Sequence, residues 1–250
     1  MNICVITDNE YLYREFKKLI QAYDKKYKFD FFYSAFNKKM NQIMKQNFEY
    51  RPIDLRKEDH KFWDNYELFL SLHCKQIFPD ELVKNYRCIN IHPGFNPYNR
   101  GWYPQAFSII NHKPVGVTIH EMDTQLDHGS IIVQEEVPIY EYETSYDVYK
   151  KIQNVELKLL KTNLLKILER DYAIQRPKIE GNINYRADFD KLCELDLDKI
   201  GTYRQFIEQL RATTFPPYDN AFFYDISGEK IYISINIKRT NNQIKEEWNP

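Results

Sequence analysis

Short apolar runs and amphipathic segments alternate along the first half of the chain. Residues 2–7 form an apolar run that predicts a buried strand. Residues 10–23 follow with charges between apolar positions at helical spacing, where we expect Tyr11, Phe16 and Ile20 to share the buried face. Further short elements are expected at residues 28–34, 67–72, 80–85, 88–91 and 103–111, and residues 41–49 are ambiguous. A strand followed directly by a helix predicts an α/β domain with a parallel sheet.

The pattern changes in the second half of the chain. Residues 115–121 and 130–138 alternate between apolar and polar side chains, which predicts two paired strands joined by an acidic loop. Thr144 then fits the N-cap of a long amphipathic helix that runs to about Asp171, and Asp147 completes a pattern like a capping box. These elements extend the prediction to a Rossmann-like, mostly parallel sheet flanked by helices.

A polar stretch at residues 175–184, with Pro177 and Gly181, reads as a linker. We therefore expect a main domain over residues 1–174 and a small C-terminal region over residues 175–250. In that region, residues 202–210 predict a helix, and residues 221–225 and 230–237 predict a β-hairpin. An exposed hairpin edge with Ile231, Ile233 and Ile235 is a contact surface for self-association, and we expect a homodimer.

Composition and charge indicate which classes of partner and which cell compartment to expect. The 35 Lys and Arg nearly balance the 36 Asp and Glu, so a phosphate backbone is a disfavoured partner and we expect no nucleic acid. No apolar run approaches the roughly 20 residues that a membrane span needs, so we expect no membrane partner. The four cysteines include no CxxC pair and predict no disulfide framework, which favours a reducing compartment and a cytoplasmic protein.

Several common sites are absent from the sequence. The turn after the first strand is Thr7-Asp8-Asn9-Glu10, which has no glycine and two acids, so it does not fit a dinucleotide pyrophosphate. Neither a P-loop nor a GxSxG elbow occurs. Four histidines in one part of the chain match no familiar metal-ligand spacing, so we expect no metal; they are His73, His92, His120 and His128.

Residues 88–102 carry the clearest chemical signal. A buried strand ends in Asn90 and His92, and residues two apart in a strand project from the same side. Pro93 and Gly94 end the strand at once, near the carboxyl end of a parallel sheet, where open α/β sheets bind ligands. Asp127 lies in the acidic loop, and if that loop folds back over the sheet it can orient His92 and stabilise its protonated form.

Three motifs together resemble one family. Asn-x-His-Pro begins at Asn90, Arg-Gly at Arg100, and Leu-Asp-x-Gly at Leu126, and their order and spacing resemble those of the folate-dependent formyltransferases. That resemblance implies a formyl donor, 10-formyltetrahydrofolate, an amine acceptor, and a catalytic trio at Asn90, His92 and Asp127. Asn90 and protonated His92 would then donate to a developing oxyanion, and His92 would relay a proton to the leaving nitrogen.

Residues 71–79 and 92–105 are similar to the branch that formylates dTDP-linked amino-dideoxy sugars. The chain departs from the tRNA-acting members, which have a larger basic C-terminal domain, and from the ribonucleotide-acting members, which have a glycine- and serine-rich phosphate loop. The implied acceptor is dTDP-4-amino-4,6-dideoxyglucose, for O-antigen and lipopolysaccharide synthesis. A dTDP-3-amino-3,6-dideoxy sugar and water, in a formyltetrahydrofolate hydrolase, remain alternatives. A binding module without activity is a third hypothesis, which the intact trio argues against.

The resemblance also suggests binding residues. The folate is expected to contact Lys75, Gln76, Ile77, Phe78 and Asp123, with the sugar nucleotide as the alternative ligand of Lys75 and Gln76. The nucleotide sugar is expected to contact Arg100, Trp102, Tyr103 and Gln105, and the guanidinium of Arg100 suits a diphosphate. We interpret His73, His112 and His120 as structural and leave His128 open.

Overall fold

The computed structural model describes residues 1–43 and 49–239, and its centre is a seven-stranded sheet in the order β3-β2-β1-β4-β5-β7-β8. Its strands are β1 (Asn2–Thr7), β2 (Lys28–Ser34), β3 (Tyr50–Ile53), β4 (Leu68–Leu72), β5 (Cys88–His92), β7 (Gly116–Glu121) and β8 (Ile131–Glu136). The strands from β3 to β5 are parallel, whereas β7 runs antiparallel to both β5 and β8. The expected Rossmann-like α/β sheet, and the pairing of the last two strands, are confirmed.

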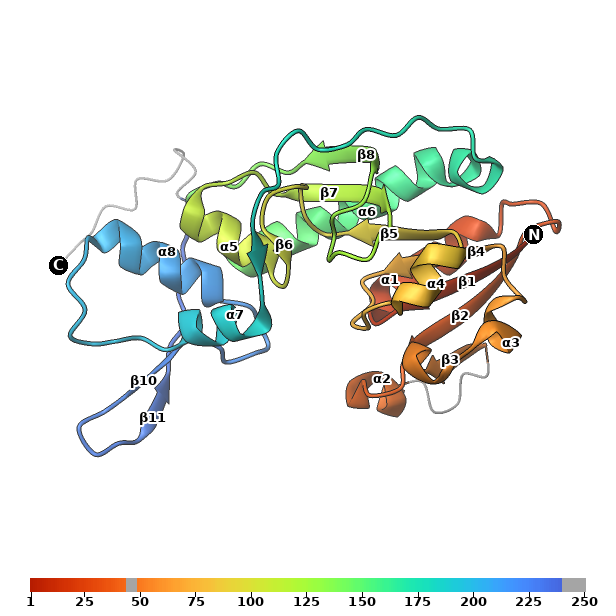
Figure 1. Cartoon of the computed structure of the whole chain (residues 1–250). Helices are drawn as coiled ribbons and strands as arrows, with labels where there is room; N and C mark the ends of the chain where they lie inside the picture. The colour runs from red at the N-terminus through yellow and green to blue at the C-terminus, as the bar shows by residue number, and fades with distance from the viewer. Residues whose placement is uncertain (44–48, 240–250) are drawn as a thin grey trace.

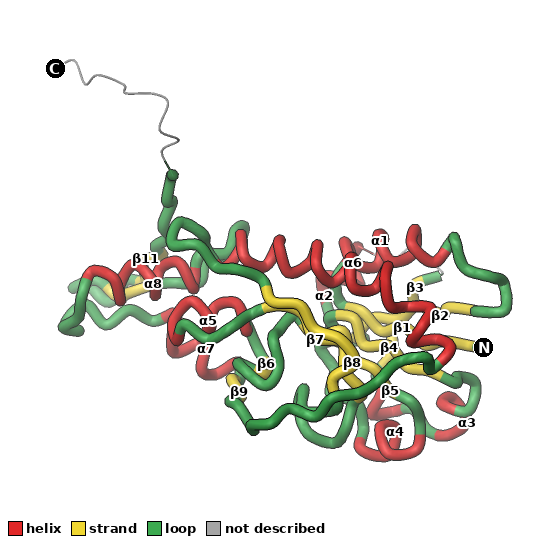
Figure 2. The backbone as a smooth tube through the Cα atoms, turned by 90° about the horizontal axis from the view of Figure 1, so that it is seen from above, coloured by secondary structure: helices red, strands yellow, loops and turns green. Residues whose placement is uncertain are grey.

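Helices cover both faces of this sheet. The helices of this part are α1 (Glu10–Ile20), α2 (Lys38–Ile43), α3 (His60–Trp63), α4 (Asp80–Asn85), α5 (Pro104–Asn111) and α6 (Ser145–Glu169), with a 3-10 turn at Leu55–Lys57. Seen from above, α1 and α6 lie on one side of the strands and α3 and α4 on the other (Figure 2). The ambiguous residues 41–49 begin inside α2, and residues 44–48 lie outside the described part of the chain.

Strand alternation explains the two layers of core. Ile3 and Val5 face the layer of α1 and α6, whereas Cys4 and Ile6 face the layer of α3 and α4. The buried face of α1 differs from the one expected, because Leu12, Tyr13 and Phe16 are buried while Tyr11 is 45% exposed. The helical spacing was therefore predicted correctly, but the buried face includes Leu12 and Tyr13 where Tyr11 was expected.

The antiparallel strand β7 brings the acidic loop to the centre of the sheet. Met122 donates its backbone N–H to Cys88 O, so residues 122–130 start beside the amino end of β5. Asn90 pairs with His120 in the β5–β7 ladder, and His92 pairs with Thr118. The loop can therefore fold back along the face of β5 from which Asn90 and His92 project, as the sequence suggested.

The C-terminal segment first pairs with a strand of the main domain and then ends in a projecting hairpin. It contains β9 (Ile183–Asn184), which pairs with β6 (Arg100–Gly101), then α7 (Arg186–Cys193), α8 (Tyr203–Thr213) and the antiparallel hairpin β10 (Phe222–Tyr224) and β11 (Lys230–Tyr232). The hairpin, confirmed in a shorter form, projects away from the sheet (Figure 1). The segment expected to be only a linker thus ends in a short strand, and α7 was not expected.

One cap fixes the start of the long helix, and one buried arginine fixes the position of the C-terminal helix. Thr144 and Asp147 form the expected capping box at the start of α6, an arrangement that contributes on the order of 1 kcal/mol. Arg211 of α8 is buried and donates to the backbone oxygens of Glu143 and Tyr140, which fixes α8 to the segment before α6.

Within the described residues, no helix is both long and apolar enough to cross a membrane.

Candidate active site

Asn90, His92 and Asp127 meet on one face of the sheet. Asn90 Nδ2 donates to Asp127 Oδ1 at 2.8 Å, and His92 Nδ1 lies 3.4 Å from Asp127 Oδ2. The side chains of His92 and Asp127 are 4% and 9% exposed. The structure therefore brings together the three residues that the motifs pointed to, in an arrangement where the carboxylate orients the imidazole.

The backbone around Asp127 fixes its carboxylate. Asp127 adopts a left-handed φ of 47°, its carbonyl accepts from Asn96 Nδ2 at 2.8 Å, and its Oδ2 accepts from the Gly101 N–H at 3.0 Å. Gly101 itself has φ +90°, and an added Cβ would lie 2.5 Å from Asn184 O. The Arg-Gly motif is thus joined directly to the Asp motif, because only glycine fits where β6 meets β9.

His120 also belongs to this cluster, which the sequence did not reveal. Its Nδ1 lies 2.9 Å from Glu121 O and therefore carries the proton, which leaves Nε2 as an acceptor for Asn90 Nδ2 at 3.3 Å. Its side chain is 2% exposed and Nε2 lies 3.8 Å from Asp127 Oδ1. The only sequence signal would have been the β5–β7 register, which places His120 beside Asn90.

Burial determines the charge of His92. It lowers the pKa of His92 to about 4, against the opposing effect of the Asp127 carboxylate. Burial alone would raise the pKa of Asp127, but His92, His120 and the Gly101 N–H together lower it to about 2. At neutral pH the pair is therefore a carboxylate and a neutral imidazole. The sequence analysis expected a protonated His92, and the burial of this side chain favours the neutral form instead.

The second ring nitrogen of His92 is left with a lone pair. A neutral imidazole that carries its hydrogen on Nδ1, the atom that faces Asp127, has an unprotonated Nε2, and this buried atom has no hydrogen-bond partner among the described residues. A Cβ on Gly94 would lie 2.3 Å from Nε2. The absence of a side chain at Gly94 therefore lets the His92 ring pack directly against the backbone of Gly94.

The residues expected to bind folate divide into anchored and open positions. Gln76 donates to Ile53 O and accepts from Leu55 N, and Phe78 is buried in the core, so both hold the segment in place. Lys75 is exposed and donates its backbone N–H to Asp8. Ile77 is 78% exposed despite its apolar side chain. This segment thus presents Ile77 and the backbone around it on a rigid support.

A second group of predicted contacts is tied to neighbouring elements. Arg100 is 2% exposed and pairs with Glu180 at 2.5 Å, while its Nε and Nη1 have no partner among the described residues. Gln105 donates to Ser145 Oγ at 3.3 Å, so its amide faces α6. Tyr103 stacks on Phe189 of α7, with ring centroids 4.1 Å apart. Trp102 is half-buried beside Tyr103, and Asp123 pairs with His128 at 2.6 Å.

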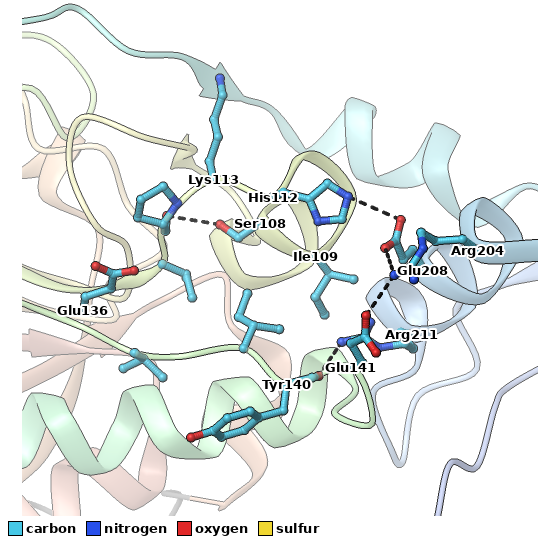
Figure 3. Close-up of a pocket in the computed structure, with 14 residues that line it drawn as sticks. Ser108, Ile109, His112, Lys113, Glu136, Tyr140, Glu141, Arg204, Glu208 and Arg211 are labelled. Atoms are coloured by element: carbon cyan, nitrogen blue, oxygen red, sulfur yellow. Dashed lines mark hydrogen bonds and ion pairs between the residues drawn. The ribbon is translucent and has the colours of Figure 1, made fainter.

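Two cavities accompany the site. One of 560 Å³ borders Asp127 and is lined by Arg100, His128 and the 176–180 segment. The other, of 290 Å³, lies between α5, α8 and the segment before α6, away from the trio (Figure 3). Its charged groups pair with one another, Arg204 with Glu141 and His112 with Glu208. Charged groups that pair with one another are typical of packing between helices. Of these two cavities, the first is the one that borders a member of the trio, Asp127.

No group of His, Cys, Asp and Glu suited to a metal ion occurs among residues 1–43 and 49–239. The cluster at the centre of the sheet instead has the components of amine acylation: a fixed carboxylate, an imidazole lone pair and an amide. An imidazole lone pair can take a proton from an attacking nitrogen and return it to a leaving nitrogen.

Comparison with known proteins agrees with this chemistry. Residues 34–164 match the formyl transferase family, and residues 188–239 match the N-formyltransferase dimerization C-terminal domain. A dTDP-4-amino-4,6-dideoxyglucose formyltransferase from Mycobacterium bovis is 47% identical over 172 residues, which are 69% of this chain and 74% of that protein.

Solved structures with the same fold extend over nearly the whole chain. A 4-N formyltransferase from Francisella tularensis is 43% identical with a TM-score of 0.91, covering 96% of this chain and 98% of that one. A sugar N-formyltransferase from a Shewanella species is 41% identical with a TM-score of 0.92, covering 96% and 99%. These findings confirm the formyl-transfer enzyme that the three motifs predicted. The chain therefore belongs to the formyl transferase family.

Proposed function

We propose that this enzyme moves a formyl group from 10-formyltetrahydrofolate to the 4-amine of dTDP-4-amino-4,6-dideoxyglucose, for O-antigen and lipopolysaccharide synthesis. The relative from Mycobacterium bovis supports the choice of acceptor. The observation that carries the chemistry is the buried Nε2 of a neutral His92, which faces Asp127 through its other nitrogen and has no hydrogen-bond partner among the described residues. An orphaned buried acceptor at this place fits an incoming amine.

We assign the central proton transfer to His92. Its Nε2 takes the proton that the acceptor nitrogen loses as the new carbon–nitrogen bond forms, and it passes this proton to the leaving folate nitrogen. Asp127 stabilises the imidazolium that exists between these two transfers, because its carboxylate faces Nδ1 at 3.4 Å. No covalent bond to the protein is needed.

The amide of Asn90 is assigned to the formyl oxygen. Both Nδ2 hydrogens are engaged in this structure, one by Asp127 at 2.8 Å and one by His120 at 3.3 Å. The contact with His120 is the longer one, so its hydrogen is the one that can turn to the oxygen as negative charge develops there. Asp127 would keep the amide plane in place during that movement.

The folate donor supplies an activated formyl group and a nitrogen that leaves with a proton. We place its pterin against residues 75–78 and the loop at Asp123, as the family resemblance suggests. Ile77 fits this role because its exposed side chain offers an apolar contact to a flat ring, while Gln76 and Phe78 hold the segment rigid.

We place the nucleotide sugar near Arg100, Trp102, Tyr103 and Gln105. Arg100 supports a diphosphate contact because its Nε and Nη1 are unpartnered among the described residues. Its Glu180 partner is 65% exposed and can move away when an anion arrives.

Incubation with 10-formyltetrahydrofolate and each nucleotide sugar, followed by mass spectrometry, tests the proposal. We expect a formyl mass on dTDP-4-amino-4,6-dideoxyglucose. Preferential formylation of a dTDP-3-amino-3,6-dideoxy sugar would instead identify the 3-amine as the acceptor. Folate turnover without any acceptor would identify a formyltetrahydrofolate hydrolase, and no formylated sugar at all would refute the proposal.

We infer a cytoplasmic homodimer. The match of residues 188–239 to a dimerization domain supports the dimer, and the exposed side chains of Ile231 and Ile233 on the projecting hairpin supply an apolar surface for it. The four cysteines are free, as is usual in a reducing compartment.

A further inference from the structure

A third histidine, half-buried, lies beside the candidate active site and has no part in the chemistry assigned above. His73 follows β4 directly, and the parallel β4–β5 register pairs Leu72 with Ile91, so His73 stands next to His92. Its φ of 55° turns the chain at this point, and its side chain is 10% exposed. The sequence suggested only a structural role for it.

His73 connects three polar groups in series. Its Nε2 lies 2.7 Å from Glu156 Oε1 on α6, and its Nδ1 lies 3.2 Å from the hydroxyl of Tyr149. Asn9 donates its Nδ2 to the same hydroxyl at 2.8 Å, and its own Oδ1 caps α1 by accepting from Leu12 N. The row therefore runs from Asn9 and a half-buried Tyr149 to a carboxyl that is 0% exposed.

The donors and acceptors of this row allow one assignment with a neutral imidazole. An amide N–H can only donate, so Tyr149 accepts from Asn9 and gives its own hydrogen to His73 Nδ1. His73 Nε2 then carries a hydrogen and faces Glu156, although the N–H does not point straight at Oε1. One lone pair of the Tyr149 oxygen remains for a further donor.

Glu156 is poorly satisfied for a buried carboxylate. Neither of its oxygens has a partner with hydrogen-bond geometry among the described residues, and burial raises its pKa while His73 lowers it. A buried carboxylate with one imidazole neighbour gains most when that imidazole becomes a cation. His92 on β5 and the phenol of Tyr218 also interact with members of the row, and Glu156 is the carboxylate that lies 2.7 Å from His73 Nε2.

The chemistry of an amine acceptor requires such a proton acceptor. An amine of this kind titrates at about 8, by analogy with an α-amino group, so at neutral pH it arrives largely as an ammonium ion that cannot attack. Acylation then involves two protons: one leaves before attack and one leaves the nitrogen during it. His92 accounts for the second proton, and burial holds its pKa too low for it to compete for the first.

We propose that Tyr149, His73 and Glu156 form a relay that removes the first proton from the acceptor ammonium; this rests on the proposed function. The ammonium N–H bond breaks and leaves its electron pair on nitrogen. The Tyr149 oxygen receives that proton and passes its own to His73 Nδ1, and the imidazolium is stabilised by the Glu156 carboxylate. The proton returns to solvent after product leaves, so the net reaction releases one proton.

The test is the pH dependence of kcat/KM for the nucleotide sugar at saturating donor, for wild type, Glu156→Gln and Tyr149→Phe. Without the relay only amine that is already neutral reacts, so we expect losses of about 30-fold at pH 6.5 that almost disappear near pH 9. Glu169→Gln removes a half-exposed carboxylate from the same helix and should follow wild type.

A purely structural role would lower activity equally at every pH, and such parallel profiles, or no loss in either variant, would overturn the relay. Wild-type formylation in the same assay separates this failure from failure of the proposed function. Tyr149→Phe removes a single oxygen from a half-buried side chain, so it remains a readable variant if Glu156→Gln does not fold.

Discussion

The Gly101 N–H donates to Asp127 Oδ2 at 3.0 Å, across 26 positions of sequence. This bond explains why an Arg-Gly pair accompanies the His and Asp motifs. The glycine allows β6 to lie against β9, and its backbone then aims a donor at the carboxylate that orients His92. Asp127 is thus positioned by backbone as well as by Asn90 and His92.

Asp127→Asn should remove most activity without unfolding the protein. One amide oxygen replaces two carboxylate oxygens, so an N–H₂ group must face a donor from either Asn90 or Gly101. The same change in a hydrolase triad lowers kcat by about 10⁴, and we expect a loss of about 10³ to 10⁴ in kcat here. Steady-state kinetics alongside circular dichroism measures both effects. Asp171→Asn, at an exposed position after α6, is the matched control; full activity in Asp127→Asn would contradict the assigned role.

Gly94→Ala should displace the His92 ring and lower activity, together with a moderate loss of stability from overpacking. Gly94 is not among the glycines with positive φ, so the backbone accepts alanine, but the added Cβ would lie 2.3 Å from His92 Nε2. We expect a fall of at least about 100-fold in kcat/KM, because a misplaced catalytic group costs that much. Gly201→Ala, whose Cβ would meet the side chains of Gln205 at 3.1 Å and Phe206 at 3.3 Å, lies away from the site and should keep wild-type rates. An active Gly94→Ala variant would show that Nε2 is not the reacting atom.

Local patterns predicted the parts of the fold and site that depend on neighbouring residues. Asn90 and His92 lie two apart in a strand, so their common face followed from strand geometry alone. His120 was missed because its contact with Asn90 depends on the register of β7 against β5, which no local pattern encodes. The phase error at Tyr11 has a similar origin, since packing against the sheet, rather than helix period, selects Leu12 and Tyr13 for burial.

His120→Phe should slow the reaction without weakening substrate binding. It keeps a somewhat larger aromatic ring but removes the acceptor that holds one hydrogen of the Asn90 amide and the donor to Glu121 O. Loss of one such bond corresponds to about 1 kcal/mol, so we expect a decrease of about fivefold in kcat and little change in KM. His120→Gln retains a side-chain acceptor and should recover part of the loss. Equal kinetics in all three proteins would exclude a positioning role.

Acid should destabilise the protein through His92. The imidazole has a pKa of about 4 when folded against 6.5 in the reference state, so between these values the unfolded chain binds a proton that the folded protein does not. The unfolding free energy therefore falls as pH decreases through that window, by on the order of 3 kcal/mol. Asp127, lowered from 3.8 to about 2, continues the loss in the same direction at lower pH.

Denaturant unfolding of wild type and His92→Gln between pH 7 and pH 4 measures this effect. The variant should have a flatter curve than wild type, whereas His60→Gln, at an exposed histidine, should retain the wild-type slope. Parallel curves for wild type and His92→Gln would mean that burial does not depress the pKa of His92.

Ile231→Glu should convert a dimer into monomers. Ile231 lies opposite Phe223 in the β10–β11 ladder, and on the other face Lys230 covers the rings of Phe222 and Tyr232. Ile231 and Ile233 are each 38% exposed, so their face of the hairpin offers apolar surface to a second copy. A buried unpaired carboxylate in that contact costs several kcal/mol, which is enough to separate the subunits at micromolar concentration. Light scattering should give half the wild-type mass for Ile231→Glu, while Leu165→Glu, at a similarly exposed position on α6, should keep the wild-type mass. A variant that still scatters as a dimer would move the interface to another surface of the C-terminal region.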